Sequence, residues 1–236
     1  MQTSLQSDYS GLEELILFEE CMPLYNNSIV NLIFKETQDS LTVLDFGAGI
    51  GTLSDLYEKK SSIKPLCIEI DSTNIEFLTN RGFKSYKHID EVSKKLDSVF
   101  SSNVLEHIED DVKTLKMIHR KMNHNSKIVL YLPAFMLLFS GLDEAVGHYR
   151  RYSKKEIQTK LKQAGFKILD SRYVDSIGFF ASLFVRLVGY NPENGLGSKR
   201  SFKIYDRIIF PLSLFFDAIG FRFLFGKNIF VVAQKS

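Results

Sequence analysis

Short apolar runs recur along the chain and alternate with longer stretches whose apolar residues are spaced three or four positions apart. The short runs end in glycine, proline or small polar residues, which is typical of strands, whereas the wider spacing predicts amphipathic helices. Strands are predicted over residues 41–46, 65–70, 83–86, 96–103, 127–132, 166–174 and 228–234. Because strands and helices alternate through the fifth strand, the order predicts a parallel, doubly wound sheet.

Local signals mark several helix ends. Asp71 is placed to cap the helix that follows the second strand, and residues 153–156 form a capping box, Ser-x-x-Glu. Two short helices are predicted ahead of the first strand, over 12–17 and 29–34, because Pro23 separates two segments of helical spacing.

The stretch between the last two predicted strands, residues 177–226, is unusually rich in phenylalanine. It carries two apolar stripes at helical spacing on either side of a loop at 191–197. The stripes are Ile177, Phe180, Phe184, Leu187 and Val188, and then Ile204, Ile208, Leu212, Phe215 and Phe216. Pro211 interrupts the second stripe, and Lys199, Arg200, Lys203 and Arg207 add positive charge along it. Such helices serve as a lid or core extension, as a membrane-interface or lipid-contacting element, or as a dimer surface, and these alternatives stay open.

Composition narrows the class of protein. The chain has 236 residues, 44% of them hydrophobic and 25% charged, which indicates one large globular domain or a domain with an appendage. A net charge of +2 gives no case for nucleic acid binding. The two cysteines, Cys21 and Cys67, form no C-x-x-C pattern. Residues 1–11 lack the arrangement of a signal peptide, and no uncharged run is long enough to span a membrane. A cytoplasmic protein is expected, with contact to the inner face of the membrane left open.

The first strand runs into three glycines set two apart, in the sequence Asp-Phe-Gly-Ala-Gly-Ile-Gly over residues 45–51. Glycine lets a cofactor approach the backbone closely and permits positive φ, so such a turn suits a nucleotide-like ligand. The dinucleotide fingerprint requires its third glycine at the position of Thr52, which argues against NAD. With Asp45 two residues before Gly47, the turn instead resembles motif I of the class I S-adenosylmethionine-dependent methyltransferases.

The second and fourth strands extend this resemblance. Glu69 closes the second strand about 20 residues past the turn, where a carboxylate can accept hydrogen bonds from both ribose hydroxyls, although a solvated acid at a strand end is the alternative. The fourth strand leads into Val-Leu-Glu-His-Ile over 104–108, which resembles small-molecule methyltransferases, including the quinone O-methyltransferase group. In that group a Glu-His pair and an upstream glutamate hold a divalent metal. Here Asn103 stands upstream, so the carboxylate-rich shell is incomplete and no metal is expected.

The loop after the fifth strand reads Asp-Glu-Ala-Val-Gly-His-Tyr-Arg-Arg-Tyr over 143–152 and resembles a segment of bacterial class I methyltransferases linked to glycan, lipid or secondary-metabolite pathways. His148 is the candidate for the base that removes an acceptor proton. Arg150 and Arg151, with Tyr149, are candidates for binding an acidic acceptor or the carboxylate end of the cofactor. The alternative is that the arginines fix the loop to its own acids, Asp143 and Glu144.

The resemblance implies an α/β fold: a Rossmann-like, doubly wound, seven-stranded and mostly parallel sheet with an antiparallel last strand and a helical insertion before it. It divides the chain into N-terminal helices (1–40) that cover the cofactor, the methyltransferase domain (41–176 and 227–236) and the insertion (177–226). The residues implied to bind the cofactor are Tyr25, Asp45, Gly47, Ala48, Gly49, Gly51, Glu69, Ile70, Asp90, Ser102, Asn103 and His107. For the adenine contact Glu91 competes with Asp90, and His107 has the alternative of a residue that packs beneath the cofactor.

The activity expected from this resemblance is in-line transfer of a methyl group from S-adenosylmethionine to a small molecule that is glycan-, lipid- or quinone-like, with an oxygen acceptor favoured. S-adenosylhomocysteine is then the product, and a homodimer is one use of the insertion. Two alternatives remain: an NAD-dependent oxidoreductase, and a membrane-surface or partner-binding protein that keeps a degenerate cofactor fold.

Overall fold

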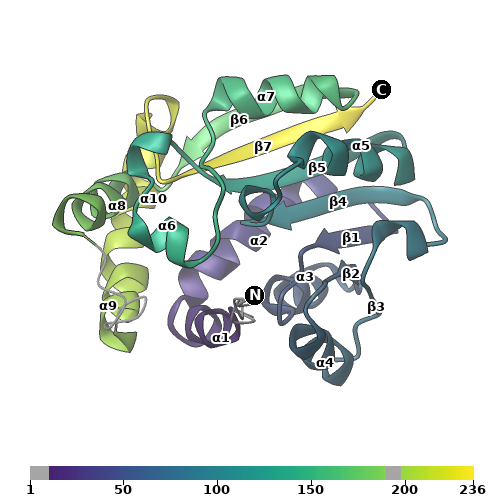
Figure 1. Ribbon diagram of the computed structural model, residues 1–236, viewed down its shortest axis with the longest axis horizontal. Coiled ribbons are helices and arrows are strands. Elements are labelled where there is room, and N and C mark those ends of the chain that lie inside the picture. The colour runs from purple at the N-terminus through teal and green to yellow at the C-terminus, as the bar shows by residue number, and fades with distance from the viewer. Residues whose placement is uncertain (1–10, 190–197) are drawn as a thin grey trace, which may run out of the picture.

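A computed structural model describes residues 11–189 and 198–236, and it contains one seven-stranded sheet (Figure 1). The strand order is β3-β2-β1-β4-β5-β7-β6, in which β1 to β5 pair in parallel and β7 runs antiparallel to both neighbours. The predicted fold class is therefore confirmed. The expectation that residues 1–11 are not a signal peptide concerns residues that, except for Gly11, lie outside the described part of the chain. The loop expected at 191–197 also lies outside it.

The strands are β1 (Val43–Phe46), β2 (Leu66–Ile68), β3 (Ser85–Tyr86), β4 (Leu96–Ser102), β5 (Met122–Pro133), β6 (Phe166–Val174) and β7 (Asn228–Lys235). The helices are α1 (Leu12–Cys21), α2 (Pro23–Thr37), α3 (Thr52–Ser61), α4 (Ser72–Asn80), α5 (Asp111–Lys121), α6 (Gly141–Ala145), α7 (Lys154–Gln163), α8 (Ser176–Val188), α9 (Lys199–Ile204) and α10 (Phe210–Ala218). Single 3₁₀ turns lie at η1 (Ile89–Glu91), η2 (Leu105–His107), η3 (Met136–Leu138) and η6 (Phe221–Phe223), and one π turn at η5 (Tyr205–Ile209).

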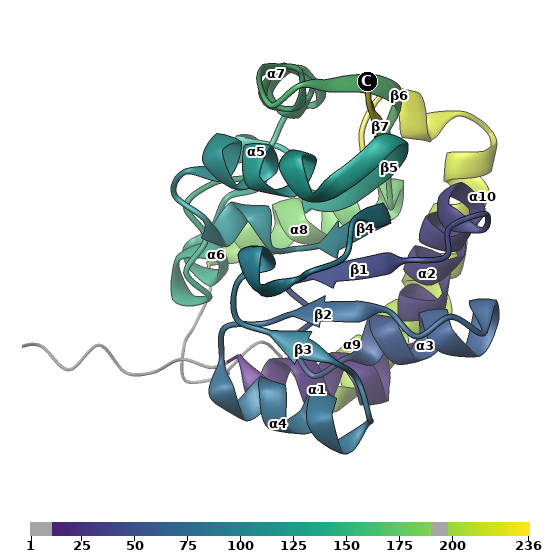
Figure 2. The same cartoon turned by 90° about the vertical axis from the view of Figure 1, so that its right-hand side faces the viewer.

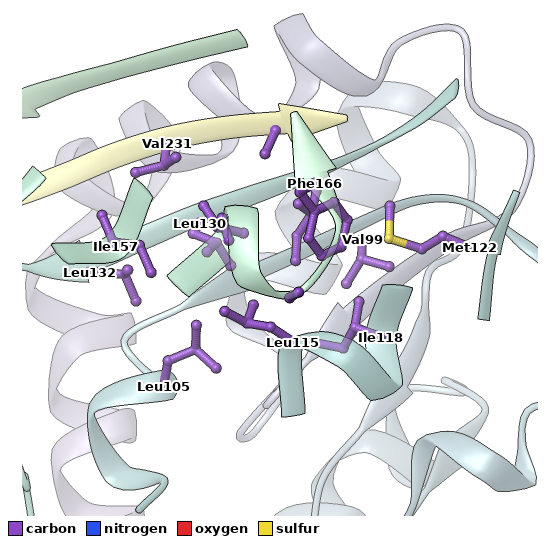
Figure 3. Packing of buried hydrophobic residues seen from close by; sticks show 14 of the residues in the cluster. Val99, Leu105, Leu115, Ile118, Met122, Leu130, Leu132, Ile157, Phe166 and Val231 are labelled. Carbon is purple, nitrogen blue, oxygen red and sulfur yellow. The ribbon is translucent and has the colours of Figure 1, made fainter. Parts of the chain in front are cut away.

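Each face of the sheet carries its own hydrophobic core, because neighbouring strand residues point to opposite sides. In β4, Val99 belongs to the core under α5 and α7, whereas Phe100 belongs to the core shared with α2 and α3. Figure 3 shows the first of these cores, where Leu115 of α5 and Ile157 of α7 pack with Leu130 of β5. Both faces are thus covered by helices, as a parallel sheet requires.

The local helix signals in the sequence correspond to real caps. The Asp71 carboxylate accepts hydrogen bonds from the backbone N–H groups of Thr73 and Asn74, and the Ser153 hydroxyl accepts one from Glu156. Pro23 is the first residue of α2, where its missing N–H costs nothing. Both N-terminal helices are longer than predicted, and β3 is shorter.

The insertion differs from the prediction at Pro211. Instead of a break, α9, the π turn η5 and α10 follow one another directly, and the π turn lies immediately before α10. Proline lacks a backbone N–H and cannot close a normal α-helical bond to the preceding turn, and a locally widened turn is one way for a helix to absorb this. Among the described residues no helix is long and apolar enough to cross a membrane.

Candidate cofactor and acceptor site

The predicted site residues converge on the edge of the sheet where the parallel strands end. Figure 2 shows the arrowheads of β1 and β2 pointing to the side on which α6 lies. The strand order reverses between β1 and β4, and crevices at such switch points are where α/β sheets bind ligands.

The glycine turn is held tightly against its neighbours. Gly47 has φ +82°, and a Cβ built there would lie 2.3 Å from Cγ2 of Val104, the residue that leads into η2. Gly51 has φ +87°, and a Cβ there would lie 2.8 Å from Cδ2 of Leu78. Only glycine meets both constraints, so the turn can pack closely against the residue that leads into η2 and against α4.

Most amides of this turn are already satisfied by protein atoms. The N–H groups of Gly47 and Ala48 donate to the carbonyl of Ile68 at 2.9 Å, and that of Gly51 donates to Ala48. These three N–H groups are therefore not free to bind a ligand. The N-terminus of α3 lies directly after the turn and leaves its first-turn N–H groups without intrahelical partners.

Glu69 joins the second strand to the glycine turn. Its Oε2 accepts a hydrogen bond from the N–H of Gly49 at 2.7 Å, and its Oε1 accepts from the N–H groups of Ile70 and Asp71 at 2.7 and 2.9 Å. A carboxylate offers about four acceptor positions, so one remains open on Oε2. Glu69 can therefore accept one ribose hydroxyl as it stands, and acceptance of both requires one backbone bond to be released.

Asp45 lies beneath the turn. It is 3% exposed, its Oδ2 accepts a hydrogen bond from the Ser54 hydroxyl of α3 at 2.7 Å, and burial raises its pKa to about 7. The carboxyl group thus ties β1 to α3. Its assigned contact with the cofactor stays a prediction.

Helix α1 covers the turn from the other side. A Cβ at Gly49 would lie 3.1 Å from Cδ1 of Leu15, which places the Leu15 side chain directly over the turn. Glu19 and Arg81 form a bidentate ion pair at 2.8 and 2.9 Å that joins α1 to the end of α4. Sequence reasoning missed Leu15, because an apolar residue at helical spacing carries no mark that distinguishes a cofactor cover from ordinary core.

Tyr25 is buried in the core that α2 shares with the insertion, and its contact with the cofactor stays a prediction. It is 4% exposed, and its ring lies 4.9 Å from that of Phe210 in the insertion. Its hydroxyl donates to Oδ1 of Asn228 at 3.1 Å and accepts from Tyr131 at 3.0 Å. Because α10 packs over it, Tyr25 reaches the edge of the sheet only through Asn228, which contacts Asn103 at 3.5 Å.

The remaining cofactor candidates are spread along this part of the chain. Asn103 is exposed at the end of β4 with φ +52°, and its amide contacts the Ser102 hydroxyl at 3.2 Å. Ile70 is 73% exposed directly after Glu69. Asp90 lies in η1, where its carbonyl accepts a hydrogen bond from Lys121 at the end of α5. The cofactor contacts of these four residues stay predictions.

A cluster of titratable groups lies where η2 meets the loop after β5. Ligand-type atoms of Glu106, His107 and His148 all lie within 4.8 Å of one another, and the two imidazole rings are 4.5 Å apart. Nε2 of His148 is 4.0 Å from Oε1 of Glu106. Burial raises the pKa of Glu106 to about 8, whereas desolvation of the ring and the neighbouring His148 lower the pKa of His107 to about 4. Near neutral pH, Glu106 and His107 are therefore both uncharged.

These three groups are also the donors that could hold a metal ion in the described part of the chain. Two imidazoles and one carboxylate suit zinc or another transition metal better than Mg²⁺ or Ca²⁺, which prefer oxygen ligands. The prediction that no metal is bound, made because Asn103 stands upstream, did not foresee His148 as a third donor and stays a prediction.

Asp143 fixes the orientation of His148. Its Oδ1 lies 2.8 Å from Nδ1 of His148, and Arg151 donates to both of its carboxylate oxygens at 2.7 and 3.1 Å. Burial alone would raise the pKa of Asp143, but the hydrogen bonds from His148 and Arg151 outweigh it and hold the pKa at about 2. An ionised Asp143 makes Nδ1 the protonated nitrogen and leaves Nε2 free to accept a proton.

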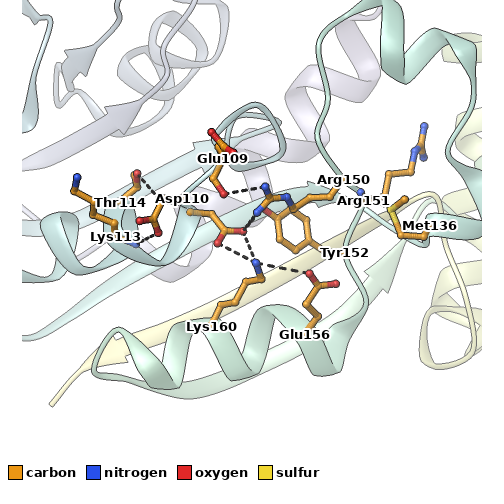
Figure 4. A network of polar contacts seen from close by, with 11 residues as sticks. Glu109, Asp110, Lys113, Thr114, Met136, Arg150, Arg151, Tyr152, Glu156 and Lys160 are labelled. Carbon is orange, nitrogen blue, oxygen red and sulfur yellow. Dashed lines mark hydrogen bonds and ion pairs between the residues drawn. The ribbon is translucent and has the colours of Figure 1, made fainter.

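The two arginines bind within the protein. Arg151 pairs with Asp143, as the structural alternative in the sequence interpretation expected. Figure 4 shows Arg150, Tyr152 and Lys160 converging on one carboxylate, which is that of Asp111, at distances of 2.8 to 3.0 Å. Both guanidinium groups therefore brace the loop, and their contact with an acceptor stays a prediction.

Polar atoms without partners mark the interior of this site. Both carboxylate oxygens of Glu106 and Nη1 of Arg151 are buried, and none of the three has a hydrogen-bond partner among the described residues. Buried polar groups are rarely left unpaired, so these three atoms are the ones that a bound water molecule or ligand would pair with. Tyr149, 56% exposed beside them, is free to contact such a ligand.

Comparison with known proteins agrees with this geometry. Residues 18–171 match the profile of the methyltransferase domain, so the chain belongs to that family. A search of curated protein sequences gives no significant match.

Solved structures of low sequence identity share the fold. A SAM-dependent methyltransferase from Archaeoglobus fulgidus has 18% identity and a TM-score of 0.65, over 97% of this chain and 100% of that one. A magnesium protoporphyrin IX methyltransferase from Synechocystis has 13% identity and a TM-score of 0.53, over 99% and 87%. The plantazolicin methyltransferase BamL has 13% identity and a TM-score of 0.57, over 96% and 88%. The predicted enzyme class, a SAM-dependent methyltransferase, is confirmed, and S-adenosylmethionine is the cofactor of that class.

Proposed function

We propose that the chain methylates a hydroxyl group of a small molecule, with S-adenosylmethionine as donor and His148 as the base. The observation that carries this proposal is the Asp143–His148 hydrogen bond of 2.8 Å, which leaves Nε2 facing buried Glu106 near the glycine turn. When bound, S-adenosylmethionine supplies an electrophilic methyl group on a positively charged sulfur.

The residues of the glycine turn fit the donor. Glu69 retains one open acceptor position for a ribose hydroxyl, and Gly47 and Gly51 allow the turn beside it to pack closely against Val104 and Leu78. Leu15 of α1 covers the turn and excludes water from that side. Excluding water and holding the reactants in line are the main contributions such a site makes to methyl transfer.

The acceptor is assigned to the space beside η2. A hydroxyl bound between Nε2 of His148 and Oε1 of Glu106 could give its proton to His148 and accept a hydrogen bond from the protonated Glu106. Nη1 of Arg151 then meets a second polar group of the acceptor. A phenol or another polar ring compound fits this set of donors, including the quinone-like acceptors that the sequence suggests.

Relatives of the same fold support a small-molecule acceptor. The plantazolicin methyltransferase was solved with a triazolic desmethylPZN analog and SAH, and the Synechocystis enzyme is a magnesium protoporphyrin IX methyltransferase. We also propose the division into covering helices (1–40), methyltransferase domain (41–176 and 227–236) and insertion (177–226). The contact of Leu15 with Gly49 supports the first of these assignments.

Ligand binding to the purified full-length chain tests the donor. We expect S-adenosylhomocysteine to raise the melting temperature and NAD to leave it unchanged, because a ligand stabilises only the native state that binds it. Stabilisation by NAD alone would favour the oxidoreductase, and no response to either ligand in a folded sample would contradict the proposal.

A further inference from the structure

The insertion exposes the side chains that soluble helices normally bury. On α8, Phe180, Phe184, Leu187 and Val188 follow one another at helical spacing and are 50%, 65%, 77% and 67% exposed. They form a continuous apolar stripe that points away from the protein. Most monomeric proteins avoid exposing such a stripe, so it marks an interaction surface.

Helix α10 has the same inverted pattern. Phe215 and Ile219 are each 60% exposed, whereas the polar residues Ser213 and Asp217 are buried. Asp217 accepts hydrogen bonds from the backbone N–H groups of Asp175 and Ser176, where β6 leads into α8. The face of the helix that packs against the protein thus carries these two polar residues together with Phe210.

These buried polar contacts fix the insertion in place. The Asp175 carboxylate accepts hydrogen bonds from the hydroxyls of Ser213 and Tyr205 and so joins β6 to η5 and α10. Asp206 accepts bonds from the N–H groups of Leu24 and Tyr25 at the start of α2. Because buried hydrogen-bonded carboxylates hold both ends of the packed face, the apolar stripes face outward as a standing feature of the fold.

The exposed charged side chains on the described part of the insertion are positive. A groove of about 330 Å³ on the outside of α9 is lined by Lys199, Arg200, Lys203 and Arg207, together with Ile204 and Ile208. Lys199 pairs with Glu20 of α1 at 2.7 Å, and the other three form no ion pair among the described residues.

The acidic side chains of the described part of the insertion are turned inward. They are Asp206 and Asp217, which are 1% and 8% exposed and hydrogen-bonded as above. The exposed ionic groups of α8 to α10 are therefore all cationic.

We infer that α8, α9 and α10 form a docking surface for an anionic lipid bilayer. The exposed phenylalanine and leucine side chains insert at the boundary between the lipid headgroups and the acyl chains. The groove of α9 binds lipid phosphates. Charge complementarity favours this occupant over a second copy of the chain, because two copies of the same cationic face would repel each other. Basic residues beside an apolar stripe gain from both the hydrophobic effect and the negative surface potential of such a membrane.

The surface adjoins the acceptor site. Arg186 of α8 donates a hydrogen bond to the carbonyl of Leu137 in η3, and Leu137 itself is 57% exposed. This turn belongs to the same loop that carries Asp143 and His148. A docked molecule would thus bring its acceptor loop close to the membrane, and the consequence that the acceptor is lipid-borne rests on the proposed function.

A single tryptophan tests the docking directly, since the chain has none. Phe184→Trp places the reporter on the α8 stripe, and Leu41→Trp places it two residues before β1, at a residue 83% exposed. With vesicles of phosphatidylcholine and phosphatidylglycerol, we expect a blue shift and quenching by brominated lipid for Phe184→Trp alone. No shift, or equal shifts at both positions, would overturn the inference.

Cosedimentation with the same vesicles separates the two contributions. Arg200→Glu with Lys203→Glu should reduce binding at least tenfold, and the exposed control Lys167→Glu in β6 should not. Light scattering on the free protein completes the test, because it measures the oligomeric state. If the native chain is a dimer, Phe184→Ser converts it to a monomer, and neither form binds vesicles, the surface serves self-association instead. Because vesicle binding needs no cofactor, these results do not depend on whether the chain methylates anything.

Discussion

The N–H of Gly49 donates a 2.7 Å hydrogen bond to Oε2 of Glu69. This bond connects the glycine turn after β1 to the end of β2, two segments that the sequence analysis assigned to one cofactor site. The carboxylate thus organises the turn before any ligand arrives, and one of its acceptor positions stays open.

Glu69→Gln should weaken binding of S-adenosylhomocysteine by roughly 10- to 100-fold, the value of one hydrogen bond to a charged group. The amide keeps the size of the side chain but loses the charge and half of the acceptor capacity. Isothermal titration calorimetry measures the change, and Glu76→Gln, an exposed acid on α4, is the matched control. Equal affinity in both variants would show that Glu69 serves the turn alone.

Gly47→Ala should destabilise the fold more than Gly147→Ala. Both residues have φ near +80°, which costs an alanine about 1–2 kcal/mol, but a Cβ at Gly147 meets nothing within 4 Å. At Gly47 the Cβ collides with Val104, which adds about 1–3 kcal/mol of overpacking. Urea denaturation of the two variants measures the difference.

A double-mutant cycle with Val104→Ala identifies the cause. If the collision matters, Val104→Ala should cost less in the Gly47→Ala background than in the native protein. Strict additivity would show that backbone conformation alone explains the glycine.

The sheet and the glycine turn were predictable because their signals are local. An apolar run that breaks into glycine needs no knowledge of distant residues, and the cap at Asp71 is read from its own helix. The acid at Glu69 was also found, although the bond to Gly49 was not, because backbone donors carry no signature in the sequence.

The acceptor cluster was only half predictable. Glu106 and His148 are far apart in the sequence, and only the folded loop after β5 brings them to 4.0 Å. The stripes of the insertion were found from their period, but a period does not tell which face is buried. That choice depends on Ser213 and Asp217, whose partners lie at the end of β6.

Stability should fall as pH rises through the window set by Glu106. Burial raises its pKa from about 4.5 to about 8, so between these values the folded chain holds a proton that the unfolded chain has lost. The free energy of unfolding then decreases with pH, by up to roughly 1.4 kcal/mol per pH unit. Glu106→Gln removes the contribution of Glu106, so the melting temperature of this variant should exceed that of the native chain by an amount that grows as the pH approaches 8. Glu144→Gln, at an exposed acid, should follow the native curve.

Removal of divalent metals should leave S-adenosylhomocysteine binding and methyl transfer unchanged. The cluster of Glu106, His107 and His148 offers a single carboxylate, which is a poor set for Mg²⁺ or Ca²⁺. Activity measured before and after treatment with EDTA tests this. Loss of activity that zinc restores would show instead that the two histidines and Glu106 hold a metal.

His148→Gln should lower kcat by roughly 100- to 10,000-fold with any hydroxyl acceptor that the native enzyme turns over, because the acceptor proton then has no base. Asp143→Asn should lower kcat through the same group, since Asp143 fixes the tautomer of His148 by the 2.8 Å bond to Nδ1. The two losses should therefore not add in the double variant, as expected for residues that act as a unit. S-adenosylhomocysteine affinity should stay near the native value in all three, and His124→Gln, an exposed histidine at the start of β5, controls for the substitution itself. Additive losses, or a His148→Gln enzyme with native kcat, would assign proton removal to another group.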